Sequence, residues 1–160
     1  VELLALDTPG HTMSHICLLS KTDTPALFSG DTIFAAGAGN CGGGGDPEEL
    51  FNTFVGQLAE LPNDTRIYPG HDYIANNLGF TVDREPDNEI ASALLQEVRQ
   101  SYDANEPLVT TLGLECQVNT FFRLTSKTVI RKLRDLFPTL PKDPTPKEVF
   151  LRLRELRNHW

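Results

Sequence analysis

Three short turns place a histidine or an aspartate where a strand-like apolar run stops. Two of them carry the same tripeptide, Pro-Gly-His, ending at His11 and His71, and the third, Ser-Gly-Asp, ends at Asp31. Imidazole and carboxylate groups are ligands that zinc and iron accept. A lone histidine after Pro-Gly is more often an ordinary turn residue, but three such turns together favour a metal site.

The first half of the chain has an α/β pattern. Short apolar runs at 3–6, 16–19, 26–28 and 66–68 are predicted strands, and Gly, Pro and Asp separate them. Asp46, Pro47 and Glu49 predict a helix start with a capping box, and this helix should end near Leu61. A second helix is expected directly after His71, over residues 73–80.

After about residue 84 the pattern predicts helices only. One should be capped by Asp87 and continue towards Tyr102, and a loop containing Pro107 and Gly113 should follow. Two more are expected, at 126–137 and from a capping box that opens at Thr145. The sequence therefore predicts two parts, 1–84 and 85–160, of which the second is all-helical.

Composition and charge exclude several classes of function. The net charge of −8 disfavours nucleic acid, because phosphate contacts need a surplus of Lys and Arg. No apolar run reaches the ~20 residues that span a bilayer, and no charged and apolar leader opens the chain. Three cysteines without C-x-x-C spacing indicate reduced thiols rather than a disulfide framework. We expect a cytoplasmic protein without membrane or nucleic-acid partners.

Two local features indicate how a ligand would bind. Basic residues gather between Arg123 and Arg157 in this otherwise acidic chain, which would suit a small anionic substrate. A glycine-rich stretch at 37–45 is similar to a phosphate loop, but it lacks the Gly-Lys-Ser/Thr ending and the Rossmann spacing. We interpret it as a flexible loop that lines a site.

Taken together, these motifs resemble the metallo-β-lactamase superfamily and, within it, the glyoxalase II (hydroxyacylglutathione hydrolase) family. The resemblance is carried by Thr8-Pro-Gly-His11-Thr12, Phe28-Ser29-Gly30-Asp31, Tyr68-Pro-Gly-His71-Asp72-Tyr73, Glu85-Pro86-Asp87-Asn88, Asn119-Thr120-Phe121-Phe122-Arg123 and Arg152-Leu153-Arg154-Glu155-Leu156-Arg157. It implies an α+β fold: the second half of a metallo-β-lactamase αββα sandwich (1–84) followed by a small helical substrate-binding domain (85–160).

The resemblance also implies the reaction and the metals. The family hydrolyses glutathione thioesters, such as S-lactoylglutathione to lactate and glutathione, with two divalent metal ions. Zinc is expected, with iron or manganese as alternatives. His11 and His71 are similar to histidine ligands of the first and second metal, and Asp31 to the carboxylate that bridges both.

Substrate contacts are implied in the same way. Tyr73 matches a tyrosine that contacts glutathione, and Arg154 and Arg157 match two basic residues at its glycine carboxylate. Positions i and i+3 share a helix face, and guanidinium groups suit a carboxylate, although a solvated helix face has the same pattern. His15 begins an apolar strand and is interpreted as structural. Asp72 is a candidate to support the neighbouring ligand His71.

The sequence departs from the family pattern in two places. The family's T-H-x-H-x-D-H motif, which holds the other metal ligands, is absent from these 160 residues, so four of seven ligands are missing. Asn40, Cys41 and Gly42 stand where the family has a cation and aromatic residues. We therefore expect the second half of a longer enzyme. The apolar surface that the missing N-terminal half should cover is expected to be exposed or paired with another chain. The alternatives are a non-catalytic interaction module and an enzyme similar to persulfide dioxygenases, with one iron.

Overall fold

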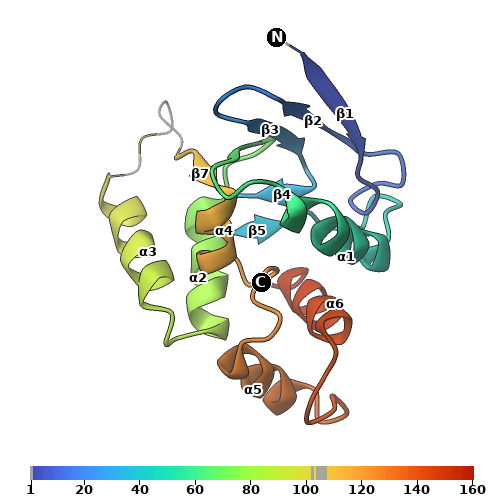
Figure 1. Cartoon of the computed structure of the whole chain (residues 1–160). Helices are drawn as coiled ribbons and strands as arrows, with labels where there is room; N and C mark the ends of the chain where they lie inside the picture. Colours follow the sequence, from blue (N-terminus) through green and yellow to red (C-terminus); the bar gives the residue numbers. More distant parts are fainter. Residues whose placement is uncertain (1, 102, 104–107) are drawn as a thin grey trace.

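The computed structural model describes residues 2–101, 103 and 108–160. A five-stranded mixed sheet and a separate two-stranded hairpin form its β part (Figure 1). In spatial order the sheet contains β1 (Leu3–Asp7), β2 (Ile16–Ser20), β3 (Ala26–Gly30), β6 (Arg66–Pro69) and β7 (Thr110–Thr111). Only β3 and β6 pair in parallel. The hairpin consists of β4 (Ile33–Phe34) and β5 (Gly37–Ala38).

In Figure 1 the helices lie beside and below this β part, with α2 to α4 at the left, α1 at the right and α5 and α6 at the bottom. They are α1 (Pro47–Gly56), the 3-10 turn η1 (Leu58–Glu60), α2 (Ile74–Arg84), α3 (Glu89–Ser101), α4 (Leu112–Val118), α5 (Lys127–Leu136) and α6 (Pro146–Arg157). The predicted α+β class is confirmed. Among the described residues, no helix is long and apolar enough to cross a membrane.

Helix starts follow the sequence signals closely. The Asp46 side chain accepts hydrogen bonds from the backbone N–H groups of Glu48 and Glu49, although Glu49 does not complete the expected capping box. The box at Thr145 is complete, with Glu148 as its second member. Helix α1 ends at Gly56 instead of Leu61, because the chain tightens there into the 3-10 turn.

The expectation that only helices follow residue 84 is wrong. Strand β7 pairs with β6, and helix α4 occupies the segment predicted as a loop around Gly113. The cap of α3 is Asn88 instead of Asp87: Asn88 Oδ1 accepts the backbone N–H of Ala91 at 2.9 Å. Tyr102, expected near the end of this helix, and Pro107, expected in the loop after it, lie outside the described residues.

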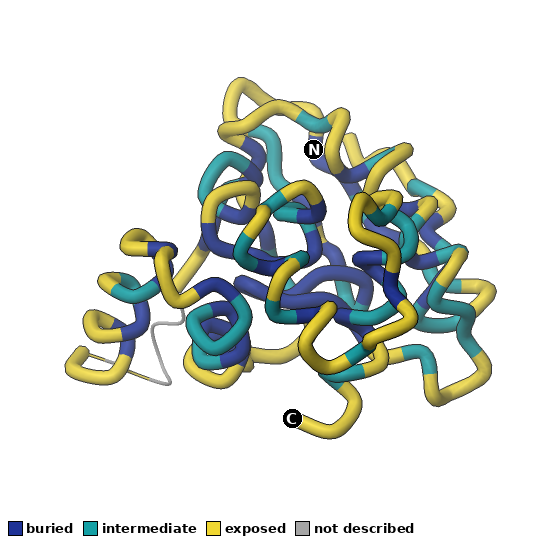
Figure 2. The backbone as a smooth tube through the Cα atoms, turned by 90° about the horizontal axis from the view of Figure 1, so that it is seen from below, coloured by how far each residue is buried: buried dark blue, intermediate teal, exposed yellow. Residues whose placement is uncertain are grey.

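One buried core joins the two predicted parts. Phe150 of α6 packs against Phe54 of α1, with ring centroids 5.4 Å apart, and against Phe121, at 5.1 Å. Leu27 and Ile67 of the sheet belong to the same cluster. Figure 2 shows buried backbone in the middle of the molecule and exposed backbone around it. The division at residue 84 stays a prediction, and the two parts share a core.

The two faces of the sheet differ in burial. Cys17, Leu19 and Leu27 are buried on one face, whereas Ile16 and Phe28 on the other are 54% and 46% exposed. Phe28 stacks on Tyr68, with ring centroids 5.4 Å apart. Exposed apolar patches of this kind mark surfaces that another segment or chain covers. An exposed apolar surface was expected, and the sheet presents one.

Candidate metal centre and adjoining pocket

The three predicted turns meet at one edge of the sheet. Strands β1, β3 and β6 run in the same direction, so the turns after them lie at the same edge. His11 Nε2 lies 3.5 Å from Asp31 Oδ2, and His71 Nε2 lies 3.6 Å from Asp31 Oδ1. Each carboxylate oxygen therefore faces a different histidine.

These distances suit shared metal ions better than direct contacts. Hydrogen bonds between nitrogen and oxygen are usually 2.7–3.2 Å long. Two ligands of one tetrahedral ion at about 2.1 Å lie about 3.4 Å apart. Within the part of the chain that the structure describes, no three His, Cys, Asp or Glu side chains form a group that could hold a metal ion. Asp31 instead faces one histidine with each carboxylate oxygen, which is the arrangement that a bridging carboxylate would have.

The orientation of the His11 ring fits a ligand role. Its Nδ1 lies 2.6 Å from the carbonyl oxygen of Asn40, which can only accept a hydrogen bond. Nδ1 is therefore the donor, and Nε2 faces Asp31. Ligand histidines are commonly oriented by such a hydrogen bond from the other ring nitrogen.

Two glycines make the approach of the turns possible. Gly10 has φ +144°, and a Cβ there would lie 2.4 Å from the Cα of Leu50 in α1. A Cβ on Gly70 would lie 2.7 Å from Asp31 Oδ1. The Pro-Gly-His turns therefore need glycine for backbone conformation at the first site and for space beside the carboxylate at the second.

His15 supports Asp31 from behind. Its Nε2 accepts the backbone N–H of Asp31 at 3.2 Å, so the proton of the neutral ring is on Nδ1, 2.9 Å from Thr32 Oγ1. Burial, followed by the charge of nearby His11, lowers the pKa of His15 and favours this neutral form. The structural interpretation of His15 agrees with this geometry, but its contact with the site could not be read from the sequence.

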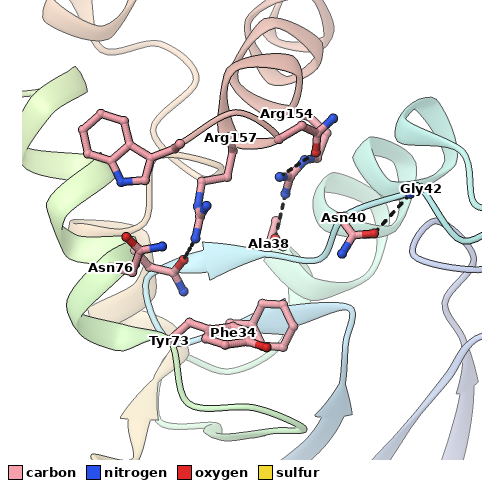
Figure 3. Close-up of a pocket in the computed structure, with 11 residues that line it drawn as sticks. Phe34, Ala38, Asn40, Gly42, Tyr73, Asn76, Arg154 and Arg157 are labelled. Carbon is pink, nitrogen blue, oxygen red and sulfur yellow. Dashed lines mark hydrogen bonds between the residues drawn. The ribbon is translucent and has the colours of Figure 1, made fainter.

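A cavity of about 450 Å³ adjoins the centre, between the hairpin, the start of α2 and the end of α6 (Figure 3). Its lining includes Phe34, Asn40, Tyr73, Arg154 and Arg157. The Tyr73 ring stacks on His71, with ring centroids 5.4 Å apart. The cavity and the histidine–aspartate centre thus share one wall.

The two arginines differ in how they face this cavity. Arg154 is only 4% exposed, and its Nη1 donates to the carbonyl oxygens of Ala38 and Gly39 at 2.7 and 2.9 Å. Arg157 is half-buried and donates from Nη2 to Asn77 Oδ1 at 3.0 Å. Burial lowers both pKa values, that of Arg154 to about 10, so both side chains remain cationic at neutral pH.

The remaining candidates lie close to the centre in different ways. Asp72 accepts the backbone N–H of Ile74 at 3.1 Å and so belongs to the turn that leads into α2. Asn40 and Gly42 of the glycine-rich stretch line the cavity, as predicted, but the stretch is not a loop throughout: Gly37 and Ala38 form strand β5. The buried Asn77 was not singled out as a candidate.

Comparison with known proteins decides the family. Residues 72–160 match the model of the family described as hydroxyacylglutathione hydrolase C-terminus. The chain belongs to the hydroxyacylglutathione hydrolase family. The matched residues include Tyr73, Arg154 and Arg157, and they contain the helices α2 to α6.

Curated relatives agree with this assignment. A hydroxyacylglutathione hydrolase from Nitrosococcus oceani is 65% identical over 160 residues, which cover all of this chain and 60% of that protein. One from a Polaromonas species is 60% identical with the same coverage. The chain therefore spans about 60% of the length of these relatives.

Solved structures agree on the fold. ETHE1 from Myxococcus xanthus has a TM-score of 0.52 and 22% identity to this chain, and the match covers 96% of this chain and 53% of that one. This likeness concerns the fold alone. The mixed sheet and the helices of this hydroxyacylglutathione hydrolase family member confirm the predicted α+β class.

Proposed function

We propose that this chain forms the C-terminal part of an enzyme that hydrolyses glutathione thioesters, such as S-lactoylglutathione, to a carboxylate and glutathione. One observation carries the proposal: the Asp31 carboxylate faces a histidine with each oxygen, directly beside a cationic cavity. The names of the relatives and the family match support the same reaction. The match over the helical residues 72–160 favours this reaction over a mononuclear iron oxygenase.

The chemistry requires water to attack the thioester carbonyl and the thiol to leave. His11, Asp31 and His71 would hold two divalent ions, zinc by preference, together with ligands from outside this chain. Bound divalent ions lower the pKa of water and polarise carbonyl groups. His15 holds the Asp31 backbone, and the Asn40 carbonyl orients the His11 ring for this task.

The substrate would bind by its glutathione part in the cavity. Arg157 lies at the cavity wall and can donate to a carboxylate, while buried Arg154 adds positive charge and shapes the wall. Tyr73, 47% exposed beside His71, would contact the tripeptide between this anchor and the reacting thioester. Asn40 and Gly42 replace the family's cation and aromatic residues here, so the peptide should be held mainly from α6 and α2.

The exposed face of the sheet would be covered by the N-terminal half of the enzyme. Ile16 and Phe28 lie on this face, and covering it would bury their exposed surface. We further propose a cytoplasmic role in methylglyoxal detoxification. The free Cys17, Cys41 and Cys116 suit a reducing compartment.

The 160-residue chain alone should bind fewer than two divalent ions, and weakly. Each ion position has only one histidine and one carboxylate oxygen in this chain, and metal affinity falls when the remaining ligands are water. Calorimetric titration with Zn²⁺ measures this directly. His11→Ala and His71→Ala should each remove binding at one position and leave the other His–Asp pair. Two tight sites in the isolated chain would refute the proposed ligand set.

A further inference from the structure

Buried side chains from three helical segments hold the β4–β5 hairpin at every residue from Ala35 to Gly39. The Asn77 amide donates to Ala35 O at 2.9 Å, and the Asn119 amide donates to Gly37 O at 3.1 Å. Arg154 donates to the next two carbonyl oxygens, and the Ala36 N–H donates to Glu115. The four side chains are between 0% and 4% exposed, so together they form a buried polar clamp on the hairpin.

Glu115 makes the most demanding of these contacts. The Ala36 N–H lies 3.1 and 3.0 Å from its two carboxylate oxygens, and Asn119 Nδ2 donates to Oε2 at 2.8 Å. Ala36 has φ +57°, a left-handed conformation that is unfavourable for a residue with a Cβ. The carboxylate therefore holds the hairpin turn in a conformation that alanine does not favour by itself.

Placing a carboxylate at this position is unfavourable for folding alone. Burial raises the pKa of Glu115 to about 7, because a charge is costly to remove from water. An apolar side chain of similar volume would avoid this cost, but it would leave the Ala36 N–H without an acceptor. Glu115 therefore contributes through the backbone geometry that it enforces at Ala36.

The clamped hairpin leads directly to the candidate metal ligands. Asn40 follows Gly39, and its carbonyl oxygen accepts the hydrogen bond from His11 Nδ1. The Gly39 N–H donates to Thr32 O at 3.1 Å, next to Asp31. Phe34 and Ala38 of the same hairpin line the cavity.

We propose that Glu115 and Asn119 are positioning residues: they hold the β4–β5 hairpin so that the Asn40 carbonyl orients His11 and the cavity wall keeps its shape. The inference rests on the proposed function for its consequences at the metal centre. Glu115 in α4 and Asn119 directly after it thus have a role beyond helix packing.

The test compares Glu115→Gln and Asn119→Ala in the chain joined to the family's N-terminal part. Glu115→Gln places an amide NH₂ against the donors of Ala36 and Asn119, and Asn119→Ala removes the donor to Gly37 without changing the carboxylate. Glu155→Gln, at an exposed ion pair with Arg152 on α6, is the control. Amide hydrogen exchange is measured over residues 33–42 and, as a reference, over β6 and α1, and Zn²⁺ affinity is measured by competition with a chelator.

Both variants should raise exchange over residues 33–42 by roughly 10- to 100-fold, with β6 and α1 unchanged, because a charge-assisted contact is lost locally. Zn²⁺ affinity should fall by about 10- to 100-fold, as expected when the orienting partner of a ligand is disturbed. Unchanged exchange in the hairpin, an equal rise in all segments, or unchanged Zn²⁺ affinity would overturn the proposal. If Glu115→Gln does not fold, Asn119→Ala decides by the same measurements. Neither readout depends on thioester hydrolysis, so a failure of the proposed reaction would be seen separately.

Discussion

Replacing Asp31 by asparagine in the complete enzyme should lower kcat for S-lactoylglutathione by on the order of a thousandfold. Among the described residues, the Asp31 carboxylate faces both His11 and His71, so its charge would serve both proposed metal positions. Bound metal ions contribute several kcal/mol to stabilising a transition state, and about 4 kcal/mol corresponds to a thousandfold change in rate. Asparagine has almost the same size but no charge, so folding should be retained.

Steady-state kinetics together with metal analysis check this prediction. Asp23→Asn, at an exposed aspartate in the turn between β2 and β3, is the matched control and should leave kcat unchanged. A kcat for Asp31→Asn within tenfold of the original enzyme would show that the carboxylate is not shared by two ions.

Arg157→Ala should raise KM for glutathione thioesters by roughly ten- to a hundredfold and change kcat little. A charge-assisted contact with a carboxylate is worth about 1.5–3 kcal/mol, and this contact would be remote from the reacting bond, equal in ground and transition states. Arg154→Ala should raise KM as well. It should also lower the free energy of unfolding, since Arg154 donates to two hairpin carbonyl oxygens.

The control for both arginines lies on the same helix. Arg152 forms an ion pair with Glu155 and is not part of the cavity lining, so Arg152→Ala should keep KM within about twofold. Unchanged KM in both Arg154→Ala and Arg157→Ala would show that these residues belong to an ordinary helix face. It would also show that the cationic cavity does not bind the substrate.

Local signals in the sequence predicted the helix starts and the strands that lead to the centre. Asp46, Ser126 and Thr145 each cap the helix that the sequence placed after them. Helix α4 and strand β7 were missed because they are only seven and two residues long and owe their existence to tertiary packing. Gly113, a usual loop residue, lies inside α4 instead.

In the candidate site, too, local motifs predicted some features and missed others. His11, Asp31 and His71 have recognisable motifs, and the structure brings them to one sheet edge. Their supporting contacts use backbone atoms, such as the Asn40 carbonyl for His11 and the Ala36 N–H for Glu115. Every residue has a backbone carbonyl, and every residue except proline has a backbone N–H. No residue type therefore marks the positions where these groups support the site.

The most direct test of the account compares hydrolysis of S-lactoylglutathione by two proteins loaded with Zn²⁺. One is the 160-residue chain, and the other is the same chain joined to an N-terminal part that carries the T-H-x-H-x-D-H motif. We predict no measurable turnover by the chain alone and turnover by the joined protein that Asp31→Asn abolishes. Efficient turnover by the chain alone, or none by the folded and metal-loaded joined protein, would contradict the account.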